Sequence, residues 1–239
     1  MEFFFSENIN KNLITLESME FLHCIKVMRN NIGDSVNVID GKGTLFEGEI
    51  ISINKGNCQI EIKNRIKNHS VRKHYTHIAI SPIKNHDRLE WFVEKSVEIG
   101  VEEISFICCS RTLRKKIKLE RVHKRAIAAI KQTLKAKLPI INAPIDIKDF
   151  IEESNSRNNF ICHLENDKRK TLFSFKKDIL KHAESCILIG PEGDFTLDEI
   201  ALCENRGFHS VTLGDSRLRT ETAGIVGCNI INMIHNDSN

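Results

Sequence analysis

Residues 187–195 read ILIGPEGDF and residues 213–223 read LGDSRLRTETA. Each stretch is an apolar run that breaks into a glycine-containing loop and then enters a helical pattern. In the first stretch, Gly190 and Gly193 let the backbone turn sharply and approach a ligand without a side-chain clash. Two such loops, roughly twenty residues apart, predict that one ligand is held between them.

The first loop leads directly into a helix start. Thr196 and Glu199 stand at the spacing of a capping box, which predicts a helix after Thr196 whose free amide groups lie beside the loop. Neither loop contains G-x-x-x-x-G-K-[ST] or G-x-G-x-x-G, the patterns that cradle phosphates in ATP and dinucleotide sites. We therefore expect a ligand of another kind, although each glycine taken alone fits an ordinary strand-to-helix turn.

Composition indicates a globular protein in a reducing compartment. The chain has 239 residues, of which 41% are hydrophobic, enough for one large domain or two modest ones. Its eight cysteines are scattered, form no C-x-x-C pair and follow no charged and apolar leader, which predicts reduced thiols in a cytoplasmic protein. The sequence has neither metal-ligand spacing nor an apolar stretch of about 20 residues, so we expect no metal site and no membrane span.

The charge is unevenly distributed along the chain. Between Arg111 and Lys137 there are eleven Lys or Arg residues and one acid, Glu120, which gives this stretch +10 and the rest of the chain −7 of the net +3. A basic stripe on an otherwise acidic protein predicts a polyanionic partner. A solvated helix face is the alternative, but Arg114 and Lys115 precede the helical pattern, where no helix face requires them.

The apolar pattern divides the chain into two parts. Residues 1–70 alternate as a β-meander with a helical stretch at 17–29, which predicts a small twisted β-barrel. Residues 71–77 are polar and basic, as in a linker, and residues 78–239 alternate strands with helices, as in a parallel α/β sheet. Helices of this second part are expected at residues 86–99, 118–137, 197–206 and 220–235, and strands at 78–81, 104–108, 160–164, 186–189 and 210–213.

Four segments carry a resemblance to a known family. Leu188 to Phe195 and Leu213 to Ala223 resemble the two signature segments of the RsmE family of 16S ribosomal RNA uridine N3-methyltransferases, in the SPOUT superfamily. Residues 21–38 resemble the family's helix, arginine and Gly-Asp turn, and residues 87–100 the first helix of its catalytic domain. The resemblance implies an α/β fold, namely a SPOUT trefoil-knot catalytic domain preceded by a small PUA-like β-barrel RNA-binding domain.

The chain departs from the family pattern at three places. Asp194 stands where the family usually has a second glycine after GPEG. Residues 216–219 read SRLR where Arg-Ile-Leu-Arg is usual, so the first arginine has moved by one position. After Gln132, Thr133 and Leu134 replace a small residue and a glycine, which predicts a changed local contact with RNA.

The resemblance implies S-adenosylmethionine as the cofactor and assigns residues to it and to RNA. Around the cofactor it places Leu164, Ile189, Gly190, Glu192, Gly193, Leu213, Gly214, Leu218, Thr220 and Ala223. Toward RNA it places Arg29, Arg88, Arg111, Arg114, Lys115 and Gln132. Loop backbone groups can read the adenine edge and apolar side chains can cover its faces, whereas Glu192 has the alternative role of holding its loop through backbone N–H groups.

Methylation at N3 of uridine requires loss of an imide proton and alignment of the nitrogen with the methyl donor. Good alignment supplies about 7 to 11 kcal/mol, so one or two polar groups suffice for the proton. We expect Arg219 to stabilise the uracil oxygen as charge develops, or to orient the flanking phosphate. Glu221 is predicted to accept the proton, with capping of the last helix as its alternative role. His163 fits a core residue better than a base.

The expected partners are 16S ribosomal RNA, within the assembled small subunit, and a second copy of the chain. The helix at 220–235 is apolar nearly all round, which predicts a homodimer through the catalytic domain. Two other functions fit the chain less well. A non-catalytic RNA-binding module would leave the loops structural, and a SPOUT ribose 2′-O-methyltransferase acting on transfer RNA would lack the RTETA segment.

Overall fold

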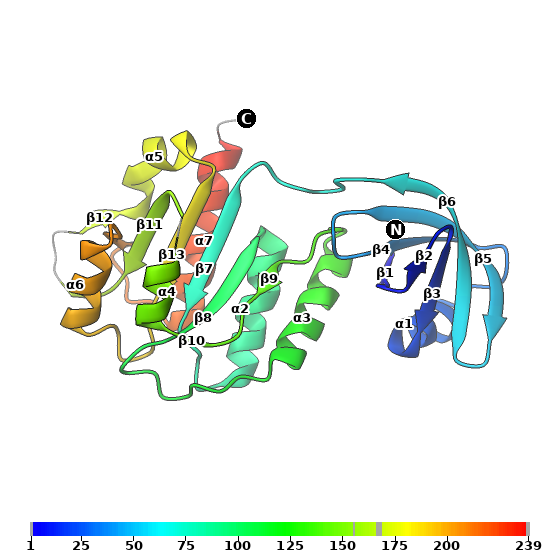
Figure 1. The fold of residues 1–239 in the computed structure, drawn as a ribbon, viewed down its shortest axis with the longest axis horizontal. Helices are drawn as coiled ribbons and strands as arrows, with labels where there is room; N and C mark the ends of the chain where they lie inside the picture. The colour runs from blue at the N-terminus through cyan, green and yellow to red at the C-terminus, as the bar shows by residue number, and fades with distance from the viewer. Residues whose placement is uncertain (1, 155, 166–168, 238–239) are drawn as a thin grey trace. The chain divides into compact units, whose positions relative to one another are not determined.

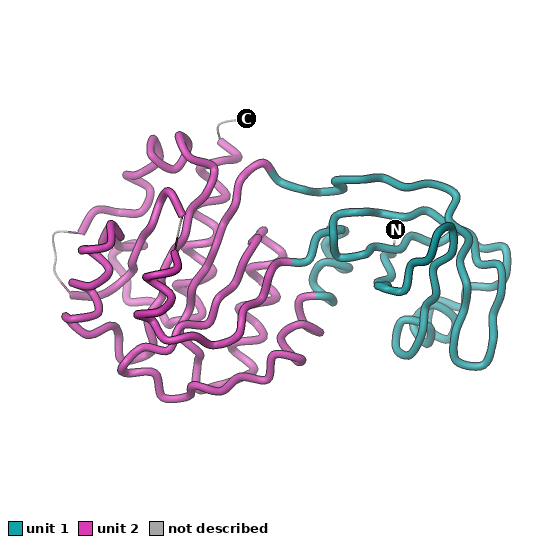
Figure 2. The backbone as a smooth tube through the Cα atoms, viewed as in Figure 1, with its two compact units in different colours: residues 1–72, 127–138 teal, residues 73–126, 139–239 magenta. Residues whose placement is uncertain are grey.

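The structure is a computed structural model that describes residues 2–154, 156–165 and 169–237. The chain forms two compact units, drawn in different colours in Figure 2. The first unit comprises residues 1–72 and 127–138, and the second comprises residues 73–126 and 139–239. The predicted division into two successive domains, 1–70 and 78–239, assigned residues 127–138 to the second domain, whereas the structure assigns them to the first unit.

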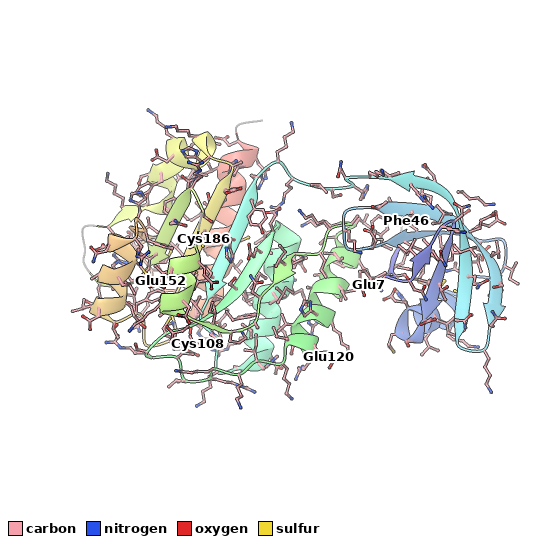
Figure 3. All side chains as sticks on the ribbon, viewed as in Figure 1. Glu7, Phe46, Cys108, Glu120, Glu152 and Cys186 are labelled. Carbon is pink, nitrogen blue, oxygen red and sulfur yellow. The ribbon has the colours of Figure 1, made fainter. Side chains whose placement is uncertain are left out.

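The first unit is built on a six-stranded sheet in the order β1-β4-β5-β6-β3-β2 (Figure 1). Its elements are β1 (Phe3–Phe5), β2 (Ile9–Asn10), β3 (Leu13–Glu17), α1 (Ser18–Leu22), the π-helical turn η1 (His23–Val27), β4 (Ser35–Ile39), β5 (Leu45–Asn54) and β6 (Asn57–Ile66). Alternate residues such as Leu16, Val38 and Ile60 are fully buried in one apolar core, because successive side chains of a strand point to opposite faces. Phe46, labelled in Figure 3, belongs to this core.

Two elements of the first unit differ from the predictions. Strand β3 was not expected, and it pairs antiparallel with β6 along its whole length. The helix predicted at 17–29 is shorter, since α1 and η1 together end at Val27. Arg29 has a φ of 59°, a left-handed conformation that no α-helix continues through.

Helix α3 (Leu119–Gln132) carries the chain from the second unit back to the first. The predicted helix at 118–137 is wrong at its end, because Leu134 has a φ of 55° and turns the chain out of the helix. The segment that follows binds the first unit through its backbone. The amide of Gly43 donates to the carbonyl of Ala136 at 2.9 Å, and the amide of Leu138 donates to the carbonyl of Gly41 at 2.8 Å.

The second unit is built on a parallel sheet in the order β10-β8-β7-β13-β11-β14-β12, with β9 also paired to β8. Its strands are β7 (Tyr75–Ile80), β8 (Glu103–Cys108), β9 (Ile140–Ile141), β10 (Ile145–Asp146), β11 (Asn158–Cys162), β12 (Lys170–Thr171), β13 (Glu184–Ile189) and β14 (His209–Thr212). Its other helices are α2 (His86–Ile99), α4 (Ile147–Glu153), the 3-10 turn η2 (Leu172–Phe175), α5 (Lys176–Lys181), α6 (Leu197–Asn205) and α7 (Thr220–Asn236).

Helices cover both faces of this sheet (Figure 1). Helix α7 packs against α2 and against β7 and β13 on one face. On the other face, side chains of α4 and α6 share an apolar core with Ala79, Ile161 and Cys186, the last labelled in Figure 3. This burial on both sides explains why the strands read as continuous apolar runs.

Strand β7 begins inside the segment predicted as a linker at 71–77. Tyr75 starts the strand, because it lies in register with Glu184 of β13 and its hydroxyl donates to Glu103 at 2.7 Å. Pairing with distant strands thus overrides the polar local composition.

Among the described helices, none is long and apolar enough to cross a membrane.

Candidate active site

The site forms where three neighbouring strands end. Strands β13, β11 and β14 lie side by side and parallel, so the loops after them emerge at one edge of the sheet, the usual place for ligands in α/β folds. These loops enclose a cavity of about 530 Å³, within the range of small-molecule sites. Nine of the ten residues predicted to hold a cofactor line it, namely Leu164, Ile189, Gly190, Glu192, Leu213, Gly214, Leu218, Thr220 and Ala223.

The GPEGDF loop after β13 is tightly held. A Cβ atom on Gly190 would stand 3.0 Å from the Phe195 ring, so only glycine fits there without movement. Asp194 has a φ of 63°, and its carboxylate accepts hydrogen bonds from the amides of Leu164 at 2.7 Å and Phe195 at 2.8 Å. Aspartate tolerates this conformation better than most residues. The aspartate that departs from the family pattern therefore ties the β13 loop to the β11 loop.

The helix start after this loop contains the predicted capping box. Thr196 accepts from the amide of Glu199 at 3.2 Å, and Glu199 accepts from the amide of Thr196 at 2.8 Å. The buried carboxylate of Glu199 also accepts from the amide and hydroxyl of Ser110, at 2.7 and 3.0 Å. Burial alone would raise the pKa of Glu199, but these hydrogen bonds outweigh it and lower the pKa.

Gly193 does not line the cavity, contrary to the expected close approach to a ligand. A Cβ atom on Gly193 would instead stand 3.4 Å from Arg111. The Arg111 guanidinium donates to the carbonyls of Gly193 at 2.7 Å and Phe195 at 3.2 Å. Arg111, predicted as an RNA contact, therefore braces the GPEGDF loop.

A second brace joins this loop to the β7–α2 loop. The Glu192 carboxylate accepts from the amide of Lys84 at 3.2 Å, the loop-holding role considered for Glu192 from the sequence. Arg114 donates to the carbonyl of Lys84 at 3.4 Å. The three loops after β7, β8 and β13 are thus linked by side chains of Glu192, Arg111 and Arg114.

The second signature segment, residues 213–223, contributes to the cavity lining and contains the start of α7. Gly214 has a φ of 137°, which favours glycine, and Thr212 hydrogen-bonds its amide and carbonyl. Arg219 is the N-cap residue of α7, and its exposed guanidinium has no partner among the described residues. Glu221, in the first turn, is 5% exposed, and its carboxylate lies 3.8 Å from Nε of Arg88. Arg88, which was predicted to contact RNA, thus lines the cavity and forms an ion pair with Glu221.

Two further side chains of the cavity wall come from the end of β11. Burial raises the pKa of Cys162 to about 12, so its thiol is protonated and is not a nucleophile at neutral pH. His163 is 5% exposed and belongs to the cavity lining, with both ring nitrogens buried. Sequence reasoning placed His163 in the core, and it missed the cavity positions of Cys162, Arg169, Pro191, Asp194 and Arg217.

The lining suits a neutral aromatic ligand with charged ends. Ile189, Leu213 and Leu218 offer apolar surface, the glycine loops offer backbone groups, and charged side chains such as Arg88, Arg219 and Glu221 complete the lining. S-adenosylmethionine has this combination of an adenine ring and a charged amino-acid tail. The described residues contain no group of His, Cys, Asp and Glu side chains that could hold a metal ion.

Comparison with known sequences decides the family. The profile of the RNA methyltransferase domain matches residues 71–232, and that of the RNA methyltransferase PUA domain matches residues 18–63. Ribosomal RNA small subunit methyltransferase E from Mesomycoplasma hyopneumoniae is 32% identical over 171 residues, which cover 69% of this chain and 72% of that protein. This chain belongs to the ribosomal RNA small subunit methyltransferase E family.

Solved structures of the family agree with this assignment. A probable rRNA-methyltransferase from Porphyromonas gingivalis superposes with a TM-score of 0.91 at 32% identity, covering all of both chains. Ribosomal RNA small subunit methyltransferase E from Neisseria gonorrhoeae, bound to S-adenosyl methionine, shares the fold with a TM-score of 0.86 at 23% identity, covering 98% of this chain and 97% of that one. The predicted α/β methyltransferase domain after a PUA domain is confirmed, whereas threading of the chain into a trefoil knot stays a prediction.

The residues predicted to contact RNA belong to both units of the chain. Arg29 and Gln132 belong to the first unit, and both are exposed. Lys115 is exposed and has no side-chain partner among the described residues. The basic stretch is also partly neutralised, because Arg121 pairs with Glu90 at 2.7 Å and other cations of α3 pair with acids.

Proposed function

We propose that the chain transfers the methyl group of S-adenosylmethionine to N3 of one uridine in the 16S ribosomal RNA of the small ribosomal subunit. Membership of the family supports ribosomal RNA methylation, and the two signature segments support the uridine N3 target. The observation that carries the proposal is the start of α7, where a buried Glu221 and an exposed Arg219, which pairs with none of the described residues, line the same cavity.

The cofactor would be held by the two glycine loops. When bound, S-adenosylmethionine supplies a methyl group on a positively charged sulfur. Ile189, Leu213 and Leu218 would cover the adenine ring, and backbone groups near Gly190 and Gly214 would contact its edge. The braces from Arg111 and Asp194 fix these loops in advance, so less ordering remains to be done on binding.

The proton of N3 would be handled by Arg219 and Glu221. A guanidinium without a protein partner can bind a uracil oxygen and stabilise the negative charge that forms as the proton leaves. Glu221 is the acid nearest to it along α7, and Arg88 fixes its orientation. Both residues act mainly by position, because alignment of the two reactants supplies most of the rate.

RNA would be bound by residues of both units. Lys115 and Lys116 are exposed and have no side-chain partner among the described residues, so they can bind phosphates. Arg29 and Gln132 would contact RNA from the PUA-like unit. A folded target in the assembled small subunit, in the cytoplasm, fits two separate binding units better than a short strand does.

A homodimer through α7 completes the proposal. Val226 and Ile230 are half-buried and Met233 is 57% exposed, and their spacing places the three on one side of the helix. Light scattering should give the mass of a dimer at micromolar concentration, and Met233→Lys should shift it toward the monomer. A monomeric wild-type protein would contradict the dimer and leave the reaction untouched.

Mass spectrometry of nucleosides tests the reaction. Small-subunit RNA from a strain that lacks this gene should lose one N3-methyluridine, and the wild-type gene should restore it. Complementation with Glu221→Gln should restore far less, whereas Glu152→Gln, the same change at an exposed residue of α4 outside the cavity, serves as the control. Loss of a ribose methylation instead would indicate the 2′-O-methyltransferase alternative, and no change together with no binding of S-adenosylmethionine would indicate a non-catalytic RNA-binding module.

A further inference from the structure

A second cavity lies at the other edge of the parallel sheet. It has a volume of about 530 Å³, and its lining includes the first residues of three neighbouring strands, namely Tyr75 of β7, Glu103 of β8 and Glu184 of β13. The cavity between the glycine loops lies where strands end, so the two cavities occupy opposite edges and share no lining residue. The reaction proposed above gives no role to this second cavity.

Polar side chains of the lining hold Glu103 in one orientation. Asn142 donates to the Glu103 carboxylate at 2.6 Å and to the Ser105 hydroxyl at 2.8 Å. The Tyr75 hydroxyl donates to the other oxygen of the same carboxylate at 2.7 Å. Each carboxylate oxygen accepts one of these bonds and keeps a second lone pair for a further donor.

The lining is negatively charged. It contains the carboxylates of Glu103, Glu153 and Glu184, and the described residues that line it include neither Lys nor Arg. Burial raises the pKa of Tyr75, and the hydrogen bond to Glu103 together with the charges of Glu103, Glu102 and Glu184 raises it further. A cavity with one sign of charge concentrates ions of the other sign, so a cation is the favoured ligand.

His77 offers an unused acceptor in the same lining. The residue is 8% exposed, and its Nε2 lies 2.8 Å from the Ser105 hydroxyl. Its Nδ1 makes no hydrogen bond with the described residues and, unlike the ring nitrogens of His163, is not closed off from solvent. Burial lowers the pKa of His77 against the opposite effect of Glu103, which favours the neutral ring.

The position of this acceptor suits an ammonium group. Nδ1 of His77 lies 3.7 Å from Oε2 of Glu103. A ligand nitrogen about 2.8 Å from both atoms can donate one hydrogen bond to each, if Nε2 carries the ring proton. A metal ion would instead need several oxygen ligands, and the described residues contain no such group.

Apolar surface accompanies these charges. The rings of Tyr75 and Phe150 line the cavity together with Ile145 and Ala143. Aromatic faces attract ammonium groups, and aliphatic side chains pack against methylenes. The lining therefore matches a molecule in which ammonium groups alternate with short hydrocarbon chains.

We propose that this cavity binds a linear aliphatic polyamine. One ammonium group bridges Nδ1 of His77 and the carboxylate of Glu103, and a second pairs with the carboxylates of Glu153 and Glu184. The inference does not depend on the proposed function, since it involves neither the cofactor nor the uridine.

Calorimetry of the full chain with spermidine tests the proposal. Glu103→Gln keeps the size of the side chain but removes its charge, so spermidine should bind at least about tenfold more weakly. Glu153→Gln should weaken binding about threefold, since an exposed ion pair contributes less. Glu152→Gln is the matched control, because this neighbouring residue of α4, labelled in Figure 3, is exposed and lies outside the cavity.

The comparison of Glu153→Gln with Glu152→Gln decides the proposal even if Glu103→Gln does not fold. Unchanged affinity in Glu153→Gln, or an equal loss in both variants, would overturn it, the latter by showing a general attraction between charges. Displacement of spermidine by an equal concentration of Mg²⁺ would also overturn it, because a simple counterion would then suffice.

Nitrogen NMR of the labelled rings gives a second readout. Spermidine should shift Nδ1 of His77 and leave the ring nitrogens of His123, on α3 outside the cavity, in place. An unshifted His77 would overturn the inference. Competition between spermidine and S-adenosylhomocysteine would do the same, by assigning the polyamine to the cavity between the glycine loops.

Discussion

The brace formed by Arg111 offers a sharp test of how the site is built. Replacing Arg111 with methionine keeps the length of the aliphatic stem but removes the guanidinium that binds the carbonyls of Gly193 and Phe195. If these bonds fix the GPEGDF loop for the cofactor, Arg111→Met should weaken cofactor binding although Arg111 does not line the cavity. A residue that only contacts phosphate would change RNA binding alone.

The size of the effect follows from the geometry. A buried hydrogen bond from a charged donor contributes about 1.5–3 kcal/mol. Arg111 is exposed, so water competes for its carbonyl partners, and we take about 1–2 kcal/mol for both bonds together. If the ligand binds only the ordered loop, this energy appears in full as lost affinity, which is roughly a 5- to 30-fold rise in Kd.

Calorimetry with S-adenosylhomocysteine measures this rise directly. Lys115→Met is the matched control, because it removes the same charge from the same loop without breaking a bond of the described side chains. The control should keep its Kd for the ligand but bind RNA less tightly, with a smaller salt dependence. Arg111→Met with the wild-type Kd would refute the reasoning, since the brace would then have no bearing on the cofactor.

Three further substitutions test other contacts. Asp194→Gly relaxes a left-handed residue but removes the acceptor for Leu164, so cofactor affinity should fall several-fold, by about 0.5–2 kcal/mol, and an unchanged Kd would show that the tie is dispensable. Gly224→Ala places a Cβ atom 2.5 Å from Phe92, so the free energy of unfolding in urea should drop by about 1–3 kcal/mol, and equal stability would contradict the packing. Because the folded protein lowers the pKa of Glu199 below its ordinary 4.5, stability from this group is complete above pH 4.5 and is lost as the pH falls through the folded pKa. Glu199→Gln should therefore flatten the acid limb of stability against pH, and an unaltered limb would assign the loss to other groups.

The sequence predicted correctly those features that are determined by residues close together in the chain. Helix α2 has the predicted bounds, the capping box of Thr196 and Glu199 is present, and α7 extends one residue beyond its predicted end. These features follow from apolar periodicity and from polar residues at fixed short spacings, which local hydrogen bonds determine. The convergence of the two glycine loops followed from the parallel alternation of strands and helices.

What the sequence did not predict depends on residues far apart in the chain. Arg111 reads as one more cation of a basic stripe, and only the fold brings it to the carbonyl of Gly193. In the sequence Asp194 looks like the loss of a glycine, although its backbone has the left-handed conformation and its side chain accepts a hydrogen bond from Leu164 in the loop after β11. The apolar strand β11 gave no sign that Cys162 and His163 at its end belong to the cavity lining.

The return of residues 127–138 to the first unit bears on how the chain folds during synthesis. Gly43 forms a backbone hydrogen bond with Ala136, and Gly41 forms one with Leu138. Glu20 forms an ion pair with Lys131 at 2.6 Å. The amino-terminal sheet therefore leaves the ribosome about sixty residues before the segment that completes it. Domains usually fold in the order in which they are made. Here the first unit must wait for its own residues 127–138, which are made after residues 73–126 of the second unit. A nascent chain stopped after residue 72 should therefore be more open to proteases than one stopped after residue 138.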